Sequence, residues 1–251
     1  MIKCFRNISL ISVICLFIAC EAAKTEEQTE LLYELTRYDK ENCDGDKCAK
    51  VSFLYPYFDE SHPLSRNLNA HIEEQLKMYL QFGVFDDYAT LDEAVEHYFS
   101  LFEQSGDTTL WSVDVEGQVS FQNDRLLSME FVNTSLIGHD QPSNHLMFLN
   151  FDLEDGTLLL RDEIVLDEAV LLEKAERKFR RHHAVAEEVS LAEDGRFFLE
   201  GTRFFLPFSM GYRGADFVLF YNYYEICPIE MGATEITFPL EELDGIILTQ
   251  N

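Results

Sequence analysis

The chain has 251 residues, of which 46 are acidic and 19 basic, so its formal net charge is −27. This balance excludes a nucleic-acid-binding protein, because phosphate binding requires a basic face. Hydrophobic residues make up 47% and aromatic residues 13% of the chain, far more core-forming material than a disordered acidic segment carries. Composition therefore predicts an acidic protein with a folded core, and it indicates no particular chemistry.

The N-terminus is typical of an export signal. Two basic residues precede a mostly apolar stretch, residues 8–19, that is too short to span a bilayer as a helix. The stretch ends in a small residue followed by Cys20, which resembles the lipobox of bacterial lipoproteins, although Phe17 replaces the usual leucine. We expect a lipoprotein signal peptide over 1–19 and lipidation of Cys20. The alternative is an ordinary cleavable signal peptide with an incidental cysteine.

The polar, acidic residues after Cys20 are typical of a tether between a lipid anchor and a folded domain. Several acyl chains hold a protein firmly on a bilayer surface without inserting it. The sequence therefore predicts an exported bacterial lipoprotein, periplasmic or on the cell surface, that contacts the membrane through its anchor only.

Three further cysteines follow Cys20. Cys43 and Cys48 bracket a turn-forming sequence that can bring their Cα atoms within bridging range, so we expect a small disulfide at the end of a tether over 20–48. Cys227 is expected to be a small buried apolar residue. The acids near the turn lack the glycine and terminal glutamate of an EF-hand, and no cysteine and histidine set has zinc spacing. We therefore expect no metal and no cofactor.

The part of the chain over 49–150 begins with a strand that is expected to stop at Pro56. Apolar residues at intervals of four then predict one helix, and a capping box at Thr90 predicts the start of a second. Apolar residues at intervals of two follow and predict antiparallel strands. The expected elements are a strand over 50–55, helices over 61–83 and 90–106, and strands over 111–131.

The part over 151–251 mixes strands and helices unevenly. The expected elements from its start onward are a strand over 145–153, a helix over 167–181, and strands over 197–199, 203–206, 217–221 and 234–238. This order favours an α+β fold, with an antiparallel sheet and helices packed on one face, over a doubly wound α/β fold. Because no linker rich in glycine or proline divides the chain, we expect the two parts to pack as one unit.

Several segments resemble a known family. The sequence NFDLEDG at 150–156, the run FVLFYNYYEI at 217–226 and ITFP at 236–239 resemble DUF3298, a module found in the extracellular domain of the lysozyme-sensing anti-sigma factor RsiV. The preceding part, with Tyr-Pro at 55–56 and Leu-Asn-Ala at 68–70, is similar to the usual N-terminal companion, DUF4163, named after the peptidoglycan deacetylase PdaC. The resemblance covers nearly all of the chain after residue 48.

The resemblance implies a binding or sensing module at the cell envelope, with a cationic protein such as lysozyme as a candidate ligand. The loop of the family that contains glycine and histidine is partly kept here as Gly138 and His139, so the resemblance implies a ligand contact there. The acidic charge of the chain is of the sign that attracts basic partners, although charge alone confers no specificity.

The residues contain no recognisable catalytic set. A carbohydrate deacetylase needs a metal held by an aspartate and two histidines at helical spacing, and no His-x-x-x-His occurs. The serine hydrolase signature Gly-x-Ser-x-Gly is also missing. We therefore assign no catalytic residue and expect a protein that binds without catalysis. An enzyme with unrecognised catalytic residues would need a cleft that contains perturbed titrating groups.

The run from Tyr221 to Glu225 combines tyrosines with an acid, a combination that suits protein recognition or stacking on sugars. We expect Tyr221, Tyr224 and Glu225 to contact a ligand, while the other interpretation of this run is a core strand. The alternative function is a peptidoglycan- or other glycan-binding module, or a domain associated with a carbohydrate deacetylase. The glycan alternative requires Tyr221, Tyr224 and Trp111 to be exposed together.

Overall fold

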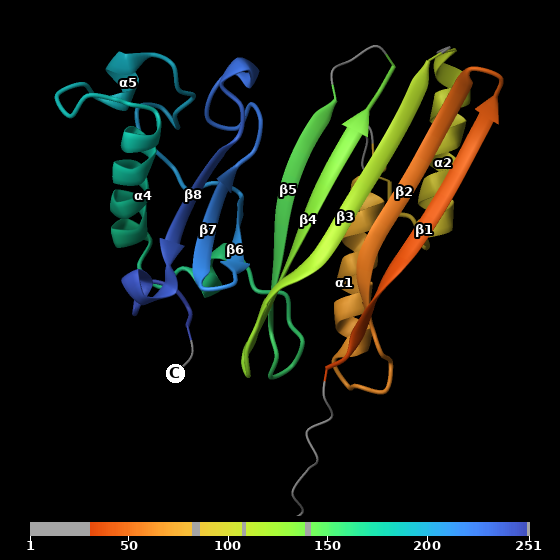
Figure 1. The fold of residues 1–251 in the computed structure, drawn as a ribbon, viewed down its shortest axis with the longest axis horizontal. Coiled ribbons are helices and arrows are strands. Elements are labelled where there is room, and N and C mark those ends of the chain that lie inside the picture. Colours follow the sequence, from red (N-terminus) through yellow and green to blue (C-terminus); the bar gives the residue numbers. More distant parts are fainter. Residues whose placement is uncertain (1–30, 82–85, 107–108, 139–141, 250–251) are drawn as a thin grey trace, which may run out of the picture. The chain divides into compact units, whose positions relative to one another are not determined.

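A computed structural model describes residues 31–81, 86–106, 109–138 and 142–249. The first sheet has five strands in the order β1-β2-β3-β4-β5 (Figure 1). The strands are β1 (Tyr33–Asp44), β2 (Lys47–Phe58), β3 (Leu110–Gln122), β4 (Leu126–Leu136) and β5 (Ser143–Asp152). All neighbouring pairs are antiparallel except β2 and β3, which run parallel because two helices connect them. The predicted α+β class is confirmed, and the sheet is mixed rather than purely antiparallel.

The helices α1 (Ser65–Met78) and α2 (Leu91–Ser105) cover one face of this sheet (Figure 1). Leu68, Ile72 and Leu76 on α1 are buried against alternating strand residues such as Val113 and Phe131, as the intervals of four and two predict. The Thr90 hydroxyl accepts a hydrogen bond from the amide of Glu93 and caps α2. The expected stop of the first helix at Gly83 lies outside the described residues, and α1 ends at Met78.

The prediction of a tether as far as residue 48 is wrong for its described part. Residues 33–44 form β1, which pairs with β2 along its whole length, and Cys43 and Cys48 form a disulfide where the hairpin turns. The sequence pattern missed β1 because the strand lies at the sheet edge, where most of its side chains are exposed.

The predicted end of the next strand at Pro56 is also wrong. The strand β2 continues through Pro56, because β3 flanks it only as far as Leu54. The predicted signal peptide and Cys20 lie outside the described residues.

A second, three-stranded antiparallel sheet follows in the order β6-β7-β8. The elements of this part are α3 (Arg161–Ile164), α4 (Glu168–His182), α5 (Leu191–Asp194), β6 (Ser209–Arg213), β7 (Asp216–Tyr221) and β8 (Thr234–Pro239), with two short 3-10 turns over Ile229–Met231 and Leu240–Leu243. The helix α4 lies beside this sheet (Figure 1), and its Phe179 packs against Tyr221 of β7. The strands expected over 197–199 and 203–206 are wrong: this stretch is irregular, because its apolar side chains fill the core beside α4 instead of extending a sheet.

The outer edge of β6 docks against the face of the first sheet that α1 and α2 leave open. The Asn150 amide donates to the carbonyl of Met210 at 2.9 Å, and the Ser128 hydroxyl donates to Asn150 Oδ1 and accepts from the Tyr212 amide. The Ser120 hydroxyl donates to the Tyr212 carbonyl at 2.7 Å. Side chains of β3, β4 and β5 therefore replace the neighbouring strand that this edge of β6 lacks.

Close backbone approach accompanies this docking. A Cβ atom on Gly211 of β6 would lie 2.5 Å from the ring of Phe148 on β5, so only glycine fits there. Arg213 adds an ion pair to Glu130 of β4 at 2.7 Å and another to Glu235 of β8 at 2.9 Å. One compact unit therefore contains both the 49–150 and the 151–251 parts. In the described part of the chain, no helix is long and apolar enough to cross a bilayer.

We predict that Asn150→Ala lowers the free energy of unfolding by about 2–3 kcal/mol, because the substitution leaves the Met210 carbonyl buried without this donor and the Ser128 hydroxyl without an acceptor for its proton. Urea denaturation monitored by circular dichroism measures this loss. Asn144→Ala is the matched control on the same strand, since its hydrogen bond to Thr134 is exposed. Equal losses in the two variants would contradict the docking role of Asn150.

Candidate functional site

The structure separates the aromatic residues that the sequence analysis grouped together. Tyr221 is fully buried, and its hydroxyl donates to the carbonyl of Phe205 at 2.7 Å, so it is a core residue. Trp111 is also buried, whereas 68% of the surface of Tyr224 is exposed. The three rings are therefore not exposed together, and the observation that the glycan alternative required is missing. Gly138 follows β4 with a positive φ of 62°, and His139 lies outside the described residues.

Tyr224 belongs to a small exposed patch that we call the aromatic corner, formed by Phe198, Phe208 and Tyr224. The rings of Phe198 and Tyr224 lie 5.2 Å apart, and Phe208 is 79% exposed. Glu225 links the two segments of the corner, because its carboxylate accepts hydrogen bonds from the backbone amides of Phe208 and Asn222 at 2.7 and 2.8 Å. Burial raises the pKa of the Glu225 carboxyl, and the two amide donors oppose that shift.

The backbone of Tyr224 is strained. Its φ of 65° lies in the left-handed region, which a tyrosine adopts at a cost of about 1–2 kcal/mol. Tyr224 lies in a turn whose Asn222 side chain hydrogen bonds to both backbone groups of Leu146 at the edge of β5. Strained residues of this kind concentrate at functional sites, because the surrounding structure must maintain them against relaxation.

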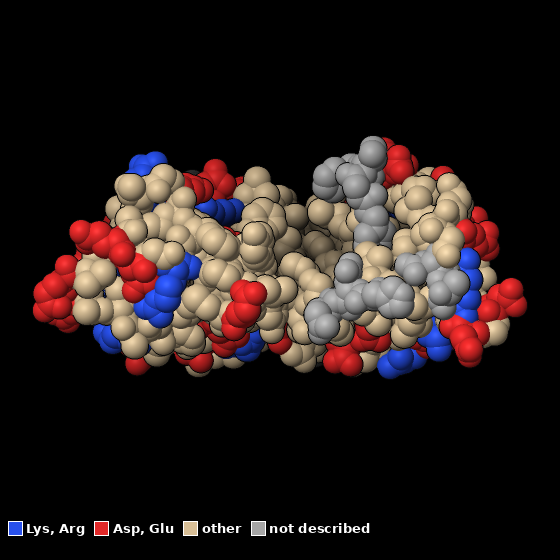
Figure 2. All heavy atoms as spheres, turned by 90° about the horizontal axis from the view of Figure 1, so that it is seen from above, with Lys and Arg blue, Asp and Glu red and all other residues tan. Residues whose placement is uncertain are grey.

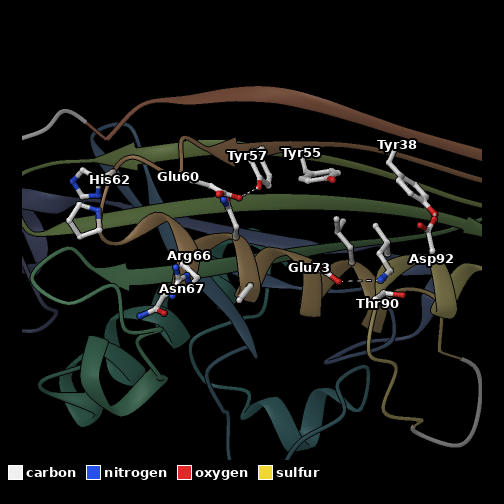
Figure 3. A pocket seen from close by; sticks show the side chains of 15 residues that line it. Tyr38, Tyr55, Tyr57, Glu60, His62, Arg66, Asn67, Glu73, Thr90 and Asp92 are labelled. Carbon is white, nitrogen blue, oxygen red and sulfur yellow. Dashed lines mark hydrogen bonds between the residues drawn. The ribbon is translucent and has the colours of Figure 1, made fainter.

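A groove that the sequence analysis missed lies between the β1–β2 hairpin and α1 (Figure 3). Its volume of about 850 Å³ is within the range of small-ligand pockets. The hairpin contributes three tyrosines to one wall, Tyr38, Tyr55 and Tyr57, and the acids of the groove are Glu60, Glu73 and Asp92. We call this feature the tyrosine groove.

Each acid of the tyrosine groove is held by one hydrogen bond from the protein. The hydroxyl of Tyr38 donates to Asp92 Oδ1 at 2.6 Å, and that of Tyr57 donates to Glu60 Oε1 at 2.9 Å. Glu73 Oε1 accepts from the amide of Leu91 in the first turn of α2, at 3.2 Å. Figure 3 shows these contacts spread along the length of the groove.

The pKa values of the groove follow from these contacts. The Tyr38 hydroxyl, and after it Lys40, lowers the pKa of the Asp92 carboxyl, whereas burial and then the Asp92 hydrogen bond raise the pKa of Tyr38. The pKa of Tyr55 is raised by burial and by the nearby charge of Glu73. At neutral pH the tyrosines are therefore neutral hydrogen-bond donors, and Asp92 is a carboxylate.

No local sequence motif predicts the tyrosine groove. Its residues come from three segments that are far apart in the sequence, and Tyr38 falls in the stretch that composition assigned to a tether. The only signal was the pair Tyr55 and Tyr57, which alternates with Pro56 and so points to one face of a strand.

One set of side chains near the hairpin turn has the spacing of metal ligands. Glu41 lies close to the sulfur atoms of Cys43 and Cys48. Both sulfur atoms are used in the disulfide, so neither is a thiolate that could bind a metal ion. This cluster is the only one of its kind among the residues that the structure describes.

Comparisons with known proteins show what this architecture resembles. No protein-family model matches the sequence, and no curated protein matches it. A solved structure of a DUF3298 family protein from Pseudomonas aeruginosa PAO1 is similar, with a TM-score of 0.66 and 16% identity over 88% of this chain and 96% of that one. A member of the same family from Bacteroides fragilis NCTC 9343 is similar too, with a TM-score of 0.64 and 18% identity over 87% and 94%.

This chain therefore has the α+β fold of the DUF3298 proteins of known structure. The likeness extends over almost the whole length of both proteins, which is more of this chain than either sheet contributes alone. It supports the resemblance to DUF3298 that the segments at 150–156 and 217–226 indicate. At these identities the likeness shows the fold alone.

We predict that Tyr38→Phe raises the pKa of Asp92 toward its ordinary value, because it removes the donor that most stabilises the carboxylate. The lowered pKa of Asp92 contributes stability above its ordinary pKa of 3.8, and that contribution is lost as the pH falls through the lowered value. The variant loses this contribution. Carbon NMR titration of the Asp92 carboxyl measures the shift, and Tyr57→Phe, whose donor serves Glu60, is expected to leave Asp92 unchanged.

Proposed function

We propose that this DUF3298-like chain is an exported lipoprotein of the bacterial cell envelope that binds a basic protein, with lysozyme as the reference ligand, and does so without catalysis. In this proposal Cys20 carries the lipid anchor, and the aromatic corner supplies the contact surface. The proposal rests on the resemblance of the sequence to a module of a lysozyme sensor, on the acidic charge of the chain and on the geometry of the corner.

The observation that carries the proposal is the strained, exposed Tyr224. An exposed aromatic side chain is a common centre of protein recognition, because it buries a large apolar area with few rotatable bonds. The side chain of Tyr224 is 68% exposed and that of Phe208 is 79% exposed, so most of each ring is available to a partner. A fold selected for stability alone would place glycine at a φ of 65°.

The negative charge of the chain attracts basic proteins in general but does not select one of them. Figure 2 shows acidic side chains spread over the face seen from above, where they do not gather into a single patch. The net charge of −27 speeds the approach of any basic protein, and salt screens that effect. Selectivity among basic partners must therefore come from a shaped contact such as the aromatic corner.

We predict that a soluble form, residues 21–251, binds a c-type lysozyme with a Kd in the micromolar range or below, and keeps part of that affinity at high salt. Isothermal titration calorimetry at low and high ionic strength measures both values. An unrelated basic protein of similar charge is the control, and its binding is expected to be weak and to vanish in salt. Equal binding of the two proteins, abolished by salt, would remove lysozyme as the ligand.

We predict opposite effects of Tyr224→Gly on stability and on binding. The free energy of unfolding rises by about 1 kcal/mol, because glycine relieves the left-handed strain, while lysozyme affinity falls by about tenfold or more. Ala184→Gly is the matched control, since Ala184 also has a positive φ, of 52°, and lies outside the corner. It is expected to gain stability and keep its affinity. Unchanged affinity in Tyr224→Gly would show that the corner is not the contact.

A further inference from the structure

The three tyrosines in the wall of the tyrosine groove are evenly spaced along the strand direction. Tyr55 and Tyr57 are two residues apart on β2, and Tyr38 of β1 lies opposite Phe53, two residues further along. The three tyrosines therefore follow the strand at intervals of about 7 Å, because a strand advances about 3.4 Å per residue. In Figure 3 they form a row along one side of the groove, with α1 on the other.

The groove also offers acceptors that the protein does not use. Glu60, Glu73 and Asp92 are each bound through one carboxylate oxygen, and in the described part of the chain the second oxygen of each has no hydrogen bond. The hydroxyl of Tyr55 has no hydrogen-bond partner among the described residues either, although this side chain is half-buried. Glu60 and Asp92 are exposed and Glu73 is partly buried, so water serves their free oxygens until a bound ammonium or guanidinium group replaces it.

The charges of the groove favour a cation. Its lining contains the three carboxylates and one guanidinium, that of Arg66, which lies near His62 at one end. Lys40 already contacts the Asp92 end of the groove, with its Nζ 3.6 Å from Asp92 Oδ1 and 5.6 Å from the centroid of the Tyr38 ring. The middle of the groove, around Glu73 and Tyr55, has no basic side chain among its lining residues. Carboxylates beside tyrosine ring faces attract ammonium and guanidinium groups both by charge and by cation–π contact.

We propose that the tyrosine groove binds an extended peptide segment that contains lysine or arginine at alternate positions. Side chains on one face of an extended peptide recur at about 7 Å, the same interval as the tyrosines, so successive cations reach successive tyrosine and carboxylate sites. The groove would give a basic partner a second contact, separate from the aromatic corner, and this inference stands whether or not the corner binds lysozyme.

The chain's own N-terminal segment is not a suitable occupant. Residues 21–30 contain four glutamates and one lysine, so their charge is of the same sign as that of the groove. A partner segment of opposite charge is the occupant that the lining favours. A neutral glycan could stack on the tyrosines, but it would leave the three carboxylates without counter-charge.

The test is calorimetric titration of residues 21–251, which include the whole compact unit, with an octapeptide of alternating lysine and serine. We expect a Kd of about 10–100 μM at low salt. The double variant Glu73→Gln/Asp92→Asn is expected to weaken binding at least about tenfold. Both amides keep an acceptor for the Leu91 amide and the Tyr38 hydroxyl, so the fold is expected to remain intact.

The matched control is the double variant Asp114→Asn/Glu116→Gln, which removes the same charge from exposed positions of β3 outside the groove. It is expected to bind the peptide as the unchanged chain does, and so is Tyr224→Gly, which separates this site from the aromatic corner. Equal weakening in both double variants would reduce the effect to net charge and overturn the inference. So would binding of a tetrasaccharide of N-acetylglucosamine, or of the matching glutamate–serine peptide, in place of the lysine peptide.

Discussion

The outer edge of β6 is the constraint on which the rest of the structure depends. Buried backbone groups at a strand edge must find partners, and here Ser120, Ser128 and Asn150 provide them from three neighbouring strands. Because one side-chain network satisfies both sheets, neither sheet can shift along the other without leaving buried polar groups unpaired. Gly211 allows this arrangement by removing the one Cβ atom that would separate the backbone from Phe148.

The two faces of the first sheet have different neighbours. One face is occupied by α1 and α2, and part of the other is occupied by β6. On the helix side, the β1–β2 hairpin faces α1 and the start of α2 across the tyrosine groove. At the other end of the unit, Asn222 ties the turn after β7 to β5 and so fixes the position from which Tyr224 projects. Both candidate sites are thus consequences of how the sheet edges are completed.

The two sites differ from the rest of the surface in different ways. Tyr224 has a backbone conformation that suits glycine, whereas the groove gathers three carboxylates, each with one oxygen that makes no hydrogen bond in the described part of the chain. Departures of this kind are expected where a protein binds something, because the missing partner completes the local chemistry. Elsewhere on the surface, exposed ion pairs such as Arg37–Asp39 and Arg177–Glu173 contribute little to stability.

The sequence by itself determined the local elements and the fold class. Helix periodicity and the Thr90 cap predicted α1 and α2, and alternation predicted β3, β4 and β7, because these patterns reflect burial of one face of each element. Only the tertiary structure decided that β1 is a strand, that Tyr221 is buried and Tyr224 exposed, and that Tyr38, Glu73 and Asp92 share a groove. The reason is physical: an edge strand carries little hydrophobic pattern, the exposure of Tyr224 is set by a backbone reversal, and a groove forms from segments that local patterns cannot bring together.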